Sequence, residues 1–291
     1  MSRKMLTFML LIILVLFTAC GSNEGEREGG QTTKDESSNR WEEIQKAGEI
    51  VVGTSGTLYP ASYYPEESDK ITGYDVEIIK EIAKRLDLDV SFEIMGIDSM
   101  LSSLDSGRID LVANDIEITK ERQKNFAFSK PYKYSFSTMI VREEDLSDIH
   151  SLEDLEGKKA GGGATTVFSD IARHFGAEVV TYTNATNDVY LRDVEKGRTD
   201  LVINDYYLQS LALKALPEIE VTLHPDLLFH PTEQAFVMPK DAEILTKIVN
   251  QVLAEMREDG TLTDLSKEFF GGKDASNPPE EDVQKIEGLE L

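Results

Sequence analysis

The sequence is poor in cysteine and in basic residues, and each shortage excludes a class of protein. Cys20 is the single cysteine among 291 residues, which excludes internal disulfides, cysteine-based zinc sites and a CxxC redox pair. Only 30 Lys and Arg stand against 54 Asp and Glu, so the formal net charge is −24. A surface of that sign repels nucleic acids and anionic membranes. Any attachment to a membrane must therefore come from something other than charge.

Motifs of common catalytic and cofactor sites are also missing. No metal-ligand spacing is found among the four histidines, His150, His174, His224 and His230, and the G-x-S-x-G nucleophile motif is absent. The glycine-rich GGGATT, residues 161–166, lacks the Gly-Lys-Ser/Thr ending of a phosphate-binding loop. We therefore expect no metal, no other cofactor and no enzymatic activity.

The N-terminus has the pattern of an export signal, predicted over residues 1–19. Arg3 and Lys4 precede an apolar run from Met5 to Phe17, which is shorter than the roughly 20 residues of a membrane-spanning helix. The run leads into FTAC, which resembles a bacterial lipoprotein signal that is cleaved before the cysteine. Acyl chains such as palmitate, attached at Cys20, would hold the protein stably at the outer face of the cell membrane. An ordinary secretory signal with an incidental cysteine is the alternative.

Two polar segments flank the folded part of the chain. Residues 20–40 are nearly free of apolar side chains, and residues 272–291 are acidic. Such segments cannot bury enough apolar surface to offset the entropy lost on ordering. We therefore expect a flexible tether and a loose acidic tail, with the folded part at about residues 41–271.

Strand-like and helix-like segments alternate within the folded part. The stretch DVEIIKEIAKRLDL, residues 75–88, places five apolar side chains on one helical face, namely Val76, Ile79, Ile82, Ala83 and Leu86. Alternation of this kind favours a mostly parallel sheet with helices on its faces. Because the pattern occurs twice, we expect two α/β lobes.

One nine-residue phrase of the sequence occurs twice, and it is called the repeated phrase below. GRIDLVAND, residues 107–115, returns as GRTDLVIND, residues 197–205, with seven of nine letters unchanged. Each copy reads as a glycine-capped helix end followed by a buried strand, with Asn-Asp at the strand's carboxyl end. Ligands in open α/β sheets bind beyond those ends, so both lobes should offer acids to a shared cleft.

Two extended segments, residues 134–144 and 232–242, lie on either side of the second unit and are expected to connect the lobes as a hinge. The predicted division is residues 41–140 and 236–271 for lobe 1 and residues 141–235 for lobe 2.

Taken together, several motifs resemble the solute-binding proteins of amino-acid ABC transporters. They cover nearly all of residues 48–270 in family order and include GYDVEIIKEIAKRL, SLDSGRIDLV, ITKERQKNFAFSKPY, GKKAGGGATT and EMREDGTLTDLSKEFF. GTLYPASYY, ANDIEIT and NDYYLQ make the chain look closest to cystine-binding lipoproteins. The resemblance implies an α/β, two-lobed fold like that of the type II periplasmic binding proteins, with two crossover strands forming a hinge.

The resemblance also implies a ligand site. Arg122 matches the family arginine that clamps the ligand's α-carboxylate, and a planar guanidinium can donate two parallel bonds to a carboxylate. Thr165 and Thr166 begin a helix whose free N–H groups attract anions, so they are expected to complete that site. Asp205 matches the acid that receives the α-ammonium group. The alternatives are a surface arginine, a plain capping turn and a solvated aspartate.

Asp115 and Glu117 depart from the commoner family pattern, which has small hydroxyl residues in this region. Either acid would pair with the second ammonium group of cystine or of another diamino compound. The alternative is that Glu117 faces water or supports Arg122. The wall positions of the family pocket are matched by Leu58, Tyr59, Ile97 and Tyr132.

The function implied is that of a lipid-anchored receptor, expected to be a monomer. It would deliver an amino acid, cystine in the first place, to the permease and ATPase of an ABC importer. The alternatives are a receptor for another polar or diamino amino acid, a dehydratase on the same scaffold that uses Asp115 or Glu117, and a sensory domain.

Overall fold

The computed structural model describes residues 39–164, 166–182 and 185–289, without the side chains of Asn39, Ile97 and Asp98. Its helices are α1 (Asn39–Ala47), α2 (Tyr74–Arg85), α3 (Ile97–Asp105), α4 (Lys120–Asn125), η2 (Leu146–Asp148), η3 (Glu153–Leu155), α5 (Val167–His174), α6 (Asn187–Glu195), α7 (Tyr206–Ala215), α8 (Glu243–Glu258) and α9 (Thr261–Phe269). The predicted signal peptide, Cys20 and most of the tether lie outside the described residues.

The strands form two larger sheets and two small ones. They are β1 (Glu49–Thr54), β2 (Thr57–Leu58), β3 (Ser62–Tyr63), β4 (Asp89–Ile94), β5 (Leu111–Val112), β6 (Phe126–Phe128), β7 (Lys133–Arg142), β8 (Lys159–Gly162), β9 (Glu178–Thr181), β10 (Val202–Asp205), β11 (Val221–Leu223), β12 (Phe229–Gln234) and β13 (Val237–Pro239). The first sheet has the order β4-β1-β5-β13-β6, and in the second β7 pairs with β10, β11 and β12. Strands β2 and β3 form one small sheet, and β8 and β9 form the other.

The first sheet contains both parallel and antiparallel neighbours. The second sheet is antiparallel and lies beside the parallel pair β8 and β9. Strand β1 is parallel to β4 and β5, whereas β13 is antiparallel to β5 and β6. Strand β7 is antiparallel to its three partners, and β8 and β9 are parallel to each other. The alternation of strands and helices therefore predicted parallel pairing within each half but not the antiparallel strands that link the halves.

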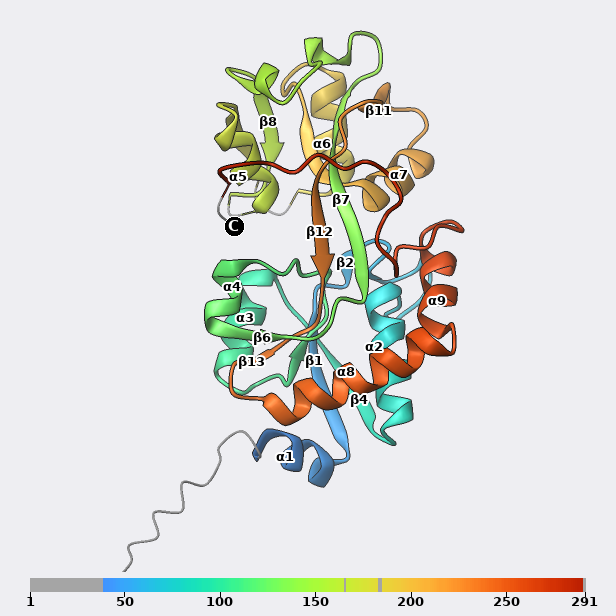
Figure 1. Cartoon of the computed structure of the whole chain (residues 1–291). Helices are drawn as coiled ribbons and strands as arrows, with labels where there is room; N and C mark the ends of the chain where they lie inside the picture. The colour runs from blue at the N-terminus through green and yellow to red at the C-terminus, as the bar shows by residue number, and fades with distance from the viewer. Residues whose placement is uncertain (1–38, 165, 183–184, 290–291) are drawn as a thin grey trace, which may run out of the picture. The chain divides into compact units, whose positions relative to one another are not determined.

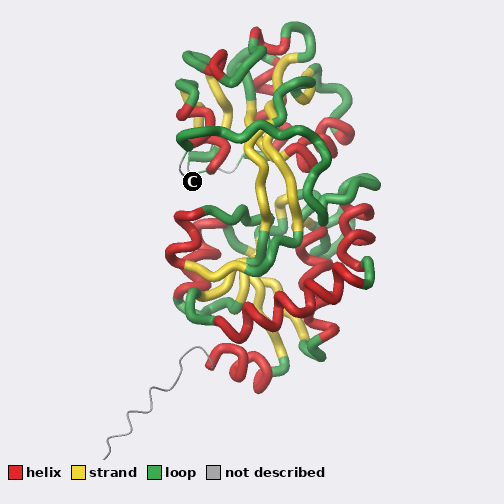
Figure 2. The backbone as a smooth tube through the Cα atoms, in the orientation of Figure 1, coloured by secondary structure: helices red, strands yellow, loops and turns green. Residues whose placement is uncertain are grey.

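The chain passes between the two larger sheets along β7 and β12. Strand β7 follows β6 of the first sheet, and β12 leads back into β13 of that sheet. The two strands pair antiparallel, with Lys133 opposite Gln234 (Figures 1 and 2). They correspond to the two connecting segments that the sequence predicted.

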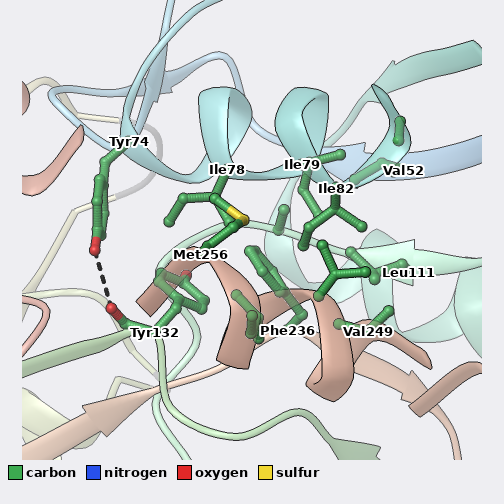
Figure 3. Packing of buried hydrophobic residues seen from close by; sticks show 14 of the residues in the cluster. Val52, Tyr74, Ile78, Ile79, Ile82, Leu111, Tyr132, Phe236, Val249 and Met256 are labelled. Carbon is green, nitrogen blue, oxygen red and sulfur yellow. Dashed lines mark hydrogen bonds between the residues drawn. The ribbon is translucent and has the colours of Figure 1, made fainter. Parts of the chain in front are cut away.

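Helices cover both faces of the first sheet because its strands are apolar on both sides. Helices α2, α8 and α9 pack on one face, and α3 packs on the other (Figure 1). On α2, Val76, Ile79, Ile82 and Ala83 are buried as predicted, and Ile78 is buried as well. Figure 3 shows how these isoleucines meet side chains of α8 and β5 in one apolar cluster.

The repeated phrase plays the same structural part in both halves. In the first copy, Asp110 accepts a hydrogen bond of 2.7 Å from the N–H of Val51 in β1. In the second copy, Asp200 accepts a hydrogen bond of 2.8 Å from the N–H of Lys159 in β8. The aspartate that both copies share therefore ties its own strand to the neighbouring parallel strand in each half.

Parts of the segment 272–289 pack against both halves of the protein, with Ala275 in the apolar cluster of the first sheet and Ile286 against that of the second, so the prediction of a loose tail was wrong. Gln284 exchanges two backbone hydrogen bonds, of 2.8 and 2.9 Å, with residues 228–230. Ile286 and Leu289 pack against the apolar cluster to which β7 and α5 contribute side chains. These two side chains supply apolar contacts that the overall acidic composition of the segment did not predict. Figure 1 shows the segment crossing from α9 past β7 and β12.

None of the helices in the described ranges is both long enough and apolar enough to cross a bilayer.

Candidate functional site

A cavity of about 540 Å³ lies beside the carboxyl ends of β5, β8 and β10. Small-molecule sites have volumes of roughly 300 to 1,000 Å³. Its polar lining consists of Asn114, Asp115, Glu117, Arg122, Ser137, Thr166, Asn204, Asp205, Thr232 and Gln234. Its apolar lining includes Leu58, Leu101, Ile116, Phe136, Val167, Phe168, Tyr190, Ile203 and Leu208. Charges of both signs among apolar walls suit a small zwitterion.

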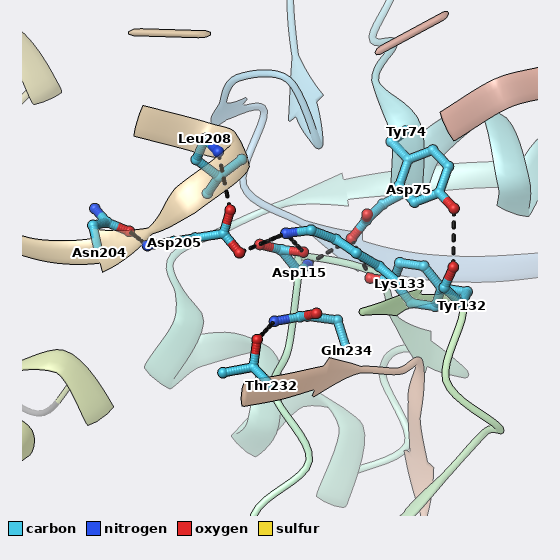
Figure 4. Close-up of polar contacts among 10 residues, drawn as sticks. All are labelled: Tyr74, Asp75, Asp115, Tyr132, Lys133, Asn204, Asp205, Leu208, Thr232 and Gln234. Atoms are coloured by element: carbon cyan, nitrogen blue, oxygen red, sulfur yellow. Dashed lines mark hydrogen bonds and ion pairs between the residues drawn. The ribbon is translucent and has the colours of Figure 1, made fainter. Parts of the chain in front are cut away.

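Lys133 joins the last residues of the two copies of the repeated phrase. Its Nζ lies 3.0 Å from both carboxylate oxygens of Asp115 and 2.9 Å from Oδ2 of Asp205 (Figure 4). The other oxygen of Asp205 accepts a hydrogen bond of 2.9 Å from the N–H of Leu208, which caps α7. The two predicted ligand-binding acids therefore meet at one point, and a cation already lies between them.

The Lys133 ammonium is held in its charged form. Burial by itself would lower the pKa of Lys133, but the charges of Asp115 and Asp205 outweigh burial and raise that pKa. The side chain of Lys133 is fully buried. Sequence reasoning missed this residue; its only signal was a charged residue at the start of an otherwise apolar connecting strand.

Asp75 lies behind Asp115 and was also missed. Its Oδ2 accepts hydrogen bonds of 2.5 Å from the N–H of Asp115 and 2.7 Å from the hydroxyl of Tyr132, while its Oδ1 has no partner among the described residues. Complete burial and the neighbouring Asp115 charge raise the pKa of Asp75 to about 7. Tyr132, predicted at the pocket wall, is instead buried in the core and is not among the cavity-lining residues.

Arg122 lines the cavity from α4. Thr119 caps this helix by accepting a hydrogen bond of 3.2 Å from the N–H of Arg122. The guanidinium donates one hydrogen bond of 2.9 Å, from Nη1 to the carbonyl oxygen of Glu117. Burial lowers the pKa of Arg122, although a guanidinium stays protonated in proteins. Since a guanidinium has five N–H donors, most remain available to a ligand carboxylate.

Glu117 lines the same cavity but is already paired. Its Oε1 lies 2.8 Å from Nε2 of His230, a residue of β12. The backbone carbonyl of Glu117, rather than its carboxylate, supports Arg122. One carboxylate oxygen of Glu117 thus remains for another donor.

The predicted helix-start residues are only partly described. Thr166 lines the cavity and accepts a hydrogen bond of 3.2 Å from the N–H of Ser169, so it caps α5. Thr165 lies outside the described residues.

The four predicted wall residues have different positions. Leu58 lines the cavity. Tyr59 does not, because its side chain is half-exposed and its ring contacts Tyr63 edge to face. Ile97 begins α3, and its side chain lies outside the described part of the chain. Of the three wall residues whose side chains the structure describes, Leu58 alone lines the cavity.

Two buried polar groups at the cavity wall have no partner among the described residues. They are Oγ of Ser137 and Oε1 of Gln234. The amide nitrogen of Gln234 donates a hydrogen bond of 2.8 Å to the hydroxyl of Thr232. This bond fixes the orientation of the amide group and therefore the position of its unpaired Oε1. Buried polar groups are seldom left unpaired without a reason, and a ligand in the cavity could supply the missing partners. The sequence offered no signal beyond their place in connecting strands.

Comparison with known proteins places the chain among binding proteins. The family model of bacterial extracellular solute-binding proteins, family 3, matches residues 50–272. The chain is 50% identical to the probable ABC transporter extracellular-binding protein YckB of Bacillus subtilis (strain 168), over 97% of this chain and 96% of that protein. It is 32% identical to the L-cystine-binding protein TcyA of the same organism, over 93% and 98% of the two chains.

The fold agrees with solved structures. A crystal structure of B. subtilis YckB superposes with a TM-score of 0.74 at 55% identity, covering 85% of this chain and 99% of that chain. The predicted fold, α/β with two lobes and two crossover strands, is confirmed by this similarity and by the two sheets described above.

Proposed function

Since this chain belongs to family 3 of the bacterial extracellular solute-binding proteins, we propose that it is the lipid-anchored receptor through which an ABC importer acquires L-cystine. Family membership makes it an extracellular binding protein of an amino-acid ABC transporter and not an enzyme. The proposal adds the ligand, the site residues and the anchor.

The cavity supports an amino-acid ligand because it presents complementary charges from separate elements. Arg122, on α4, has donors free for the α-carboxylate, and Asp205, at the end of β10, accepts an α-ammonium group. Ser137 and Gln234 add two unpartnered polar atoms. Micromolar affinity requires about 8 kcal/mol net, which two or three charge-assisted contacts in a dry cavity can supply.

The same division of charges gives a closing mechanism. Arg122 belongs to the proposed lobe 1, and Thr166 and Asp205 belong to the proposed lobe 2. A ligand that contacts both lobes binds the shut form more tightly than the open form, so it shifts the population toward the shut form. The importer would then engage the ligand-loaded receptor.

Cystine is favoured over a simple amino acid by the additional acids at the wall. Cystine has two ammonium groups and two carboxylates. If one end is held by Arg122 and Asp205, the second ammonium can reach the remaining oxygen of Glu117. The similarity to the L-cystine-binding protein TcyA also supports this choice.

Calorimetric titration of the purified protein tests the ligand assignment. The ligands are cystine, cysteine, diaminopimelate, arginine and glutamine, and cystine is expected to bind most tightly. Arg122→Lys should weaken cystine binding about 100-fold, because an ammonium cannot form the paired guanidinium–carboxylate bonds. Arg192→Lys makes the same substitution at a residue that pairs with Glu218 outside the cavity lining and should leave binding unchanged.

Three outcomes would contradict parts of the proposal. If none of the five compounds binds, the amino-acid assignment is wrong. If arginine binds most tightly, only the choice of cystine is wrong. Full affinity in the Arg122→Lys variant would exclude the carboxylate clamp.

The anchor is tested separately by cell fractionation. Wild-type protein should sediment with membranes, whereas a Cys20→Ser variant should either keep its uncleaved signal or appear in the soluble extracellular fraction without a lipid. Mass spectrometry of the N-terminal peptide distinguishes these forms. A Cys20→Ser protein that remains membrane-bound with a cleaved signal would show that the anchor is not at this residue.

A further inference from the structure

Three charged side chains form a compact cluster at the cavity wall. Asp115 and Asp205 line the cavity, with 7% and 4% of their side chains exposed. Lys133 is 0% exposed and lies behind them, with its ammonium in contact with both carboxylates. Two carboxylates and one ammonium give this cluster a net charge of −1.

The position of Lys133 makes it a permanent component of the site. Strand β7 begins at Lys133, so the backbone of this residue belongs to one of the two strands that connect the sheets. The aliphatic part of the side chain runs toward the cluster, and the ammonium lies 5.4 Å from the ring centre of Phe270. A fully buried ammonium with two carboxylate partners cannot leave without exposing unpaired buried charges, which is strongly unfavourable.

We propose that Lys133 determines the charge specificity of the ligand site: it neutralises one of the two carboxylates, so that the Asp115–Asp205 pair accepts one ligand ammonium and attracts ligands with a net positive charge less strongly than two unpaired carboxylates would. This inference rests on the proposed function, namely that an amino acid binds in this cavity. It adds a residue that contacts no ligand but sets which ligands are accepted.

The free energy involved is set by electrostatics inside the protein. Interactions between charges a few ångströms apart are many times stronger in a protein interior than in water. Without Lys133, both carboxylates would face the cavity at a net charge of −2 and would attract cationic ligands. Without one carboxylate, Lys133 and Asp205 would cancel, and the site would lose its attraction for an ammonium group. The cluster charge therefore predicts the order of ligand preference.

A charge series tests the proposal. Its members are the wild type at −1, Lys133→Met at −2, Asp115→Asn at 0, and the double variant Lys133→Met/Asp115→Asn, which returns to −1. The probes are arginine, glutamine and glutamate, which have net charges of +1, 0 and −1, together with cystine. Titrations at about pH 6 keep Asp75 mostly protonated where Asp115 is present, since its pKa is about 7 there. An Asp75→Asn background fixes the charge at this position in the variants that lack Asp115.

The expected result is a shift of the arginine-to-glutamate affinity ratio that follows the cluster charge. The ratio should rise at least about tenfold in Lys133→Met and fall at least about tenfold in Asp115→Asn. In the double variant it should return to within about threefold of wild type. A purely structural role for Lys133 would weaken all ligands together, and the second substitution would not restore the ratio.

Lys196→Met is the matched control for total charge. Lys196 is exposed and is not among the cavity-lining residues, so its removal changes the net charge of the protein by the same amount without touching the cluster. The arginine-to-glutamate affinity ratio of Lys196→Met should stay within about threefold of wild type because distant surface charges are screened by salt. If circular dichroism shows that Lys133→Met does not fold, the proposal is tested by the arginine-to-glutamate affinity ratios of Asp115→Asn and the double variant.

The proposal is overturned if the arginine-to-glutamate affinity ratio does not follow the cluster charge, or if none of the proteins binds arginine or glutamate. The proposed function fails in a different way. If wild type binds none of cystine, cysteine, diaminopimelate, arginine and glutamine, the amino-acid receptor assignment is wrong. A gain of arginine binding in Lys133→Met that is lost in the double variant would still establish the role of Lys133.

Discussion

Asp115 and Asp205 share one ammonium group, that of Lys133, at distances of 3.0 and 2.9 Å. They are the final residues of the two copies of the repeated phrase, ninety positions apart in the sequence. One follows β5 of the first sheet and the other ends β10 of the second sheet. The repeat thus brings one carboxylate from each sheet to the same place, and Lys133 keeps both ionised carboxylates from remaining unpaired.

Removing Lys133 should strongly destabilise the protein. Lys133→Met leaves two buried carboxylates without their cation, and breaking a buried pair in this way typically costs about 3–5 kcal/mol. The double variant Lys133→Met/Asp115→Asn leaves one fewer unpaired charge, so it should be at least about 1 kcal/mol more stable than Lys133→Met. Urea denaturation measures both values. Simple additivity of the two single effects would show that the residues are not coupled.

Asp75 should make stability depend on pH. Its pKa is about 7 in the folded protein against 3.8 as the ordinary value, so the folded state binds its proton more tightly. The resulting stabilisation is complete below about pH 4 and is lost as the pH rises through 7. Asp75→Asn should therefore gain stability over wild type with rising pH, by on the order of 4 kcal/mol at pH 8. Parallel stability curves in urea titrations from pH 4 to pH 8 would contradict this assignment.

Ser137 should affect ligand affinity and not stability. Its buried hydroxyl has no partner among the described residues, so Ser137→Ala should leave the melting temperature unchanged or slightly raised. Ligand affinity should fall about fivefold if the hydroxyl bonds the ligand. Ser135→Ala is the matched control, since that hydroxyl is also buried and unpartnered but does not line the cavity. Equal affinity losses in both variants would exclude a direct contact.

The C-terminal segment should contribute to the stability of the second lobe. Ile286 packs against the apolar cluster there, so Ile286→Asp should lower the free energy of unfolding by about 1–2 kcal/mol. Lys285→Asp places the same side chain at a neighbouring exposed position and should change stability by less than about 0.5 kcal/mol. Thermal unfolding followed by circular dichroism compares the two. Identical melting temperatures would indicate that the segment detaches in solution.

The sequence predicted the elements well where the signal is local. The buried face of α2 is an example, since Val76, Ile79 and Ile82 recur at helical spacing and are buried. The strand expected in the first repeat was less accurate, because pairing is limited to Leu111–Val112. The acidic average of residues 272–291 misled the prediction of a loose tail, because a composition average does not show that Ile286 and Leu289 share a contact surface.

The candidate site was predicted at residues that match the family motif or depart from it, and it was missed at positions outside any motif. Arg122, Asp115, Glu117 and Asp205 all line the cavity. Lys133 and Asp75 contact those acids from behind, so neither belongs to the wall positions that a ligand motif marks. Tyr132 was placed at the wall by its position in the motif, but its hydroxyl is oriented toward Asp75 in the core.

The sequence by itself determined the family, the alternation of strands and helices and the two acid-ending repeats, because periodicity and short motifs depend on residues close together in the chain. Only the tertiary structure decided that Lys133, 18 residues from Asp115 and 72 from Asp205, neutralises part of their charge. The physical reason is that electrostatic energy depends on distance in space and on burial. Both quantities are fixed only when the sheets and their connecting strands pack together.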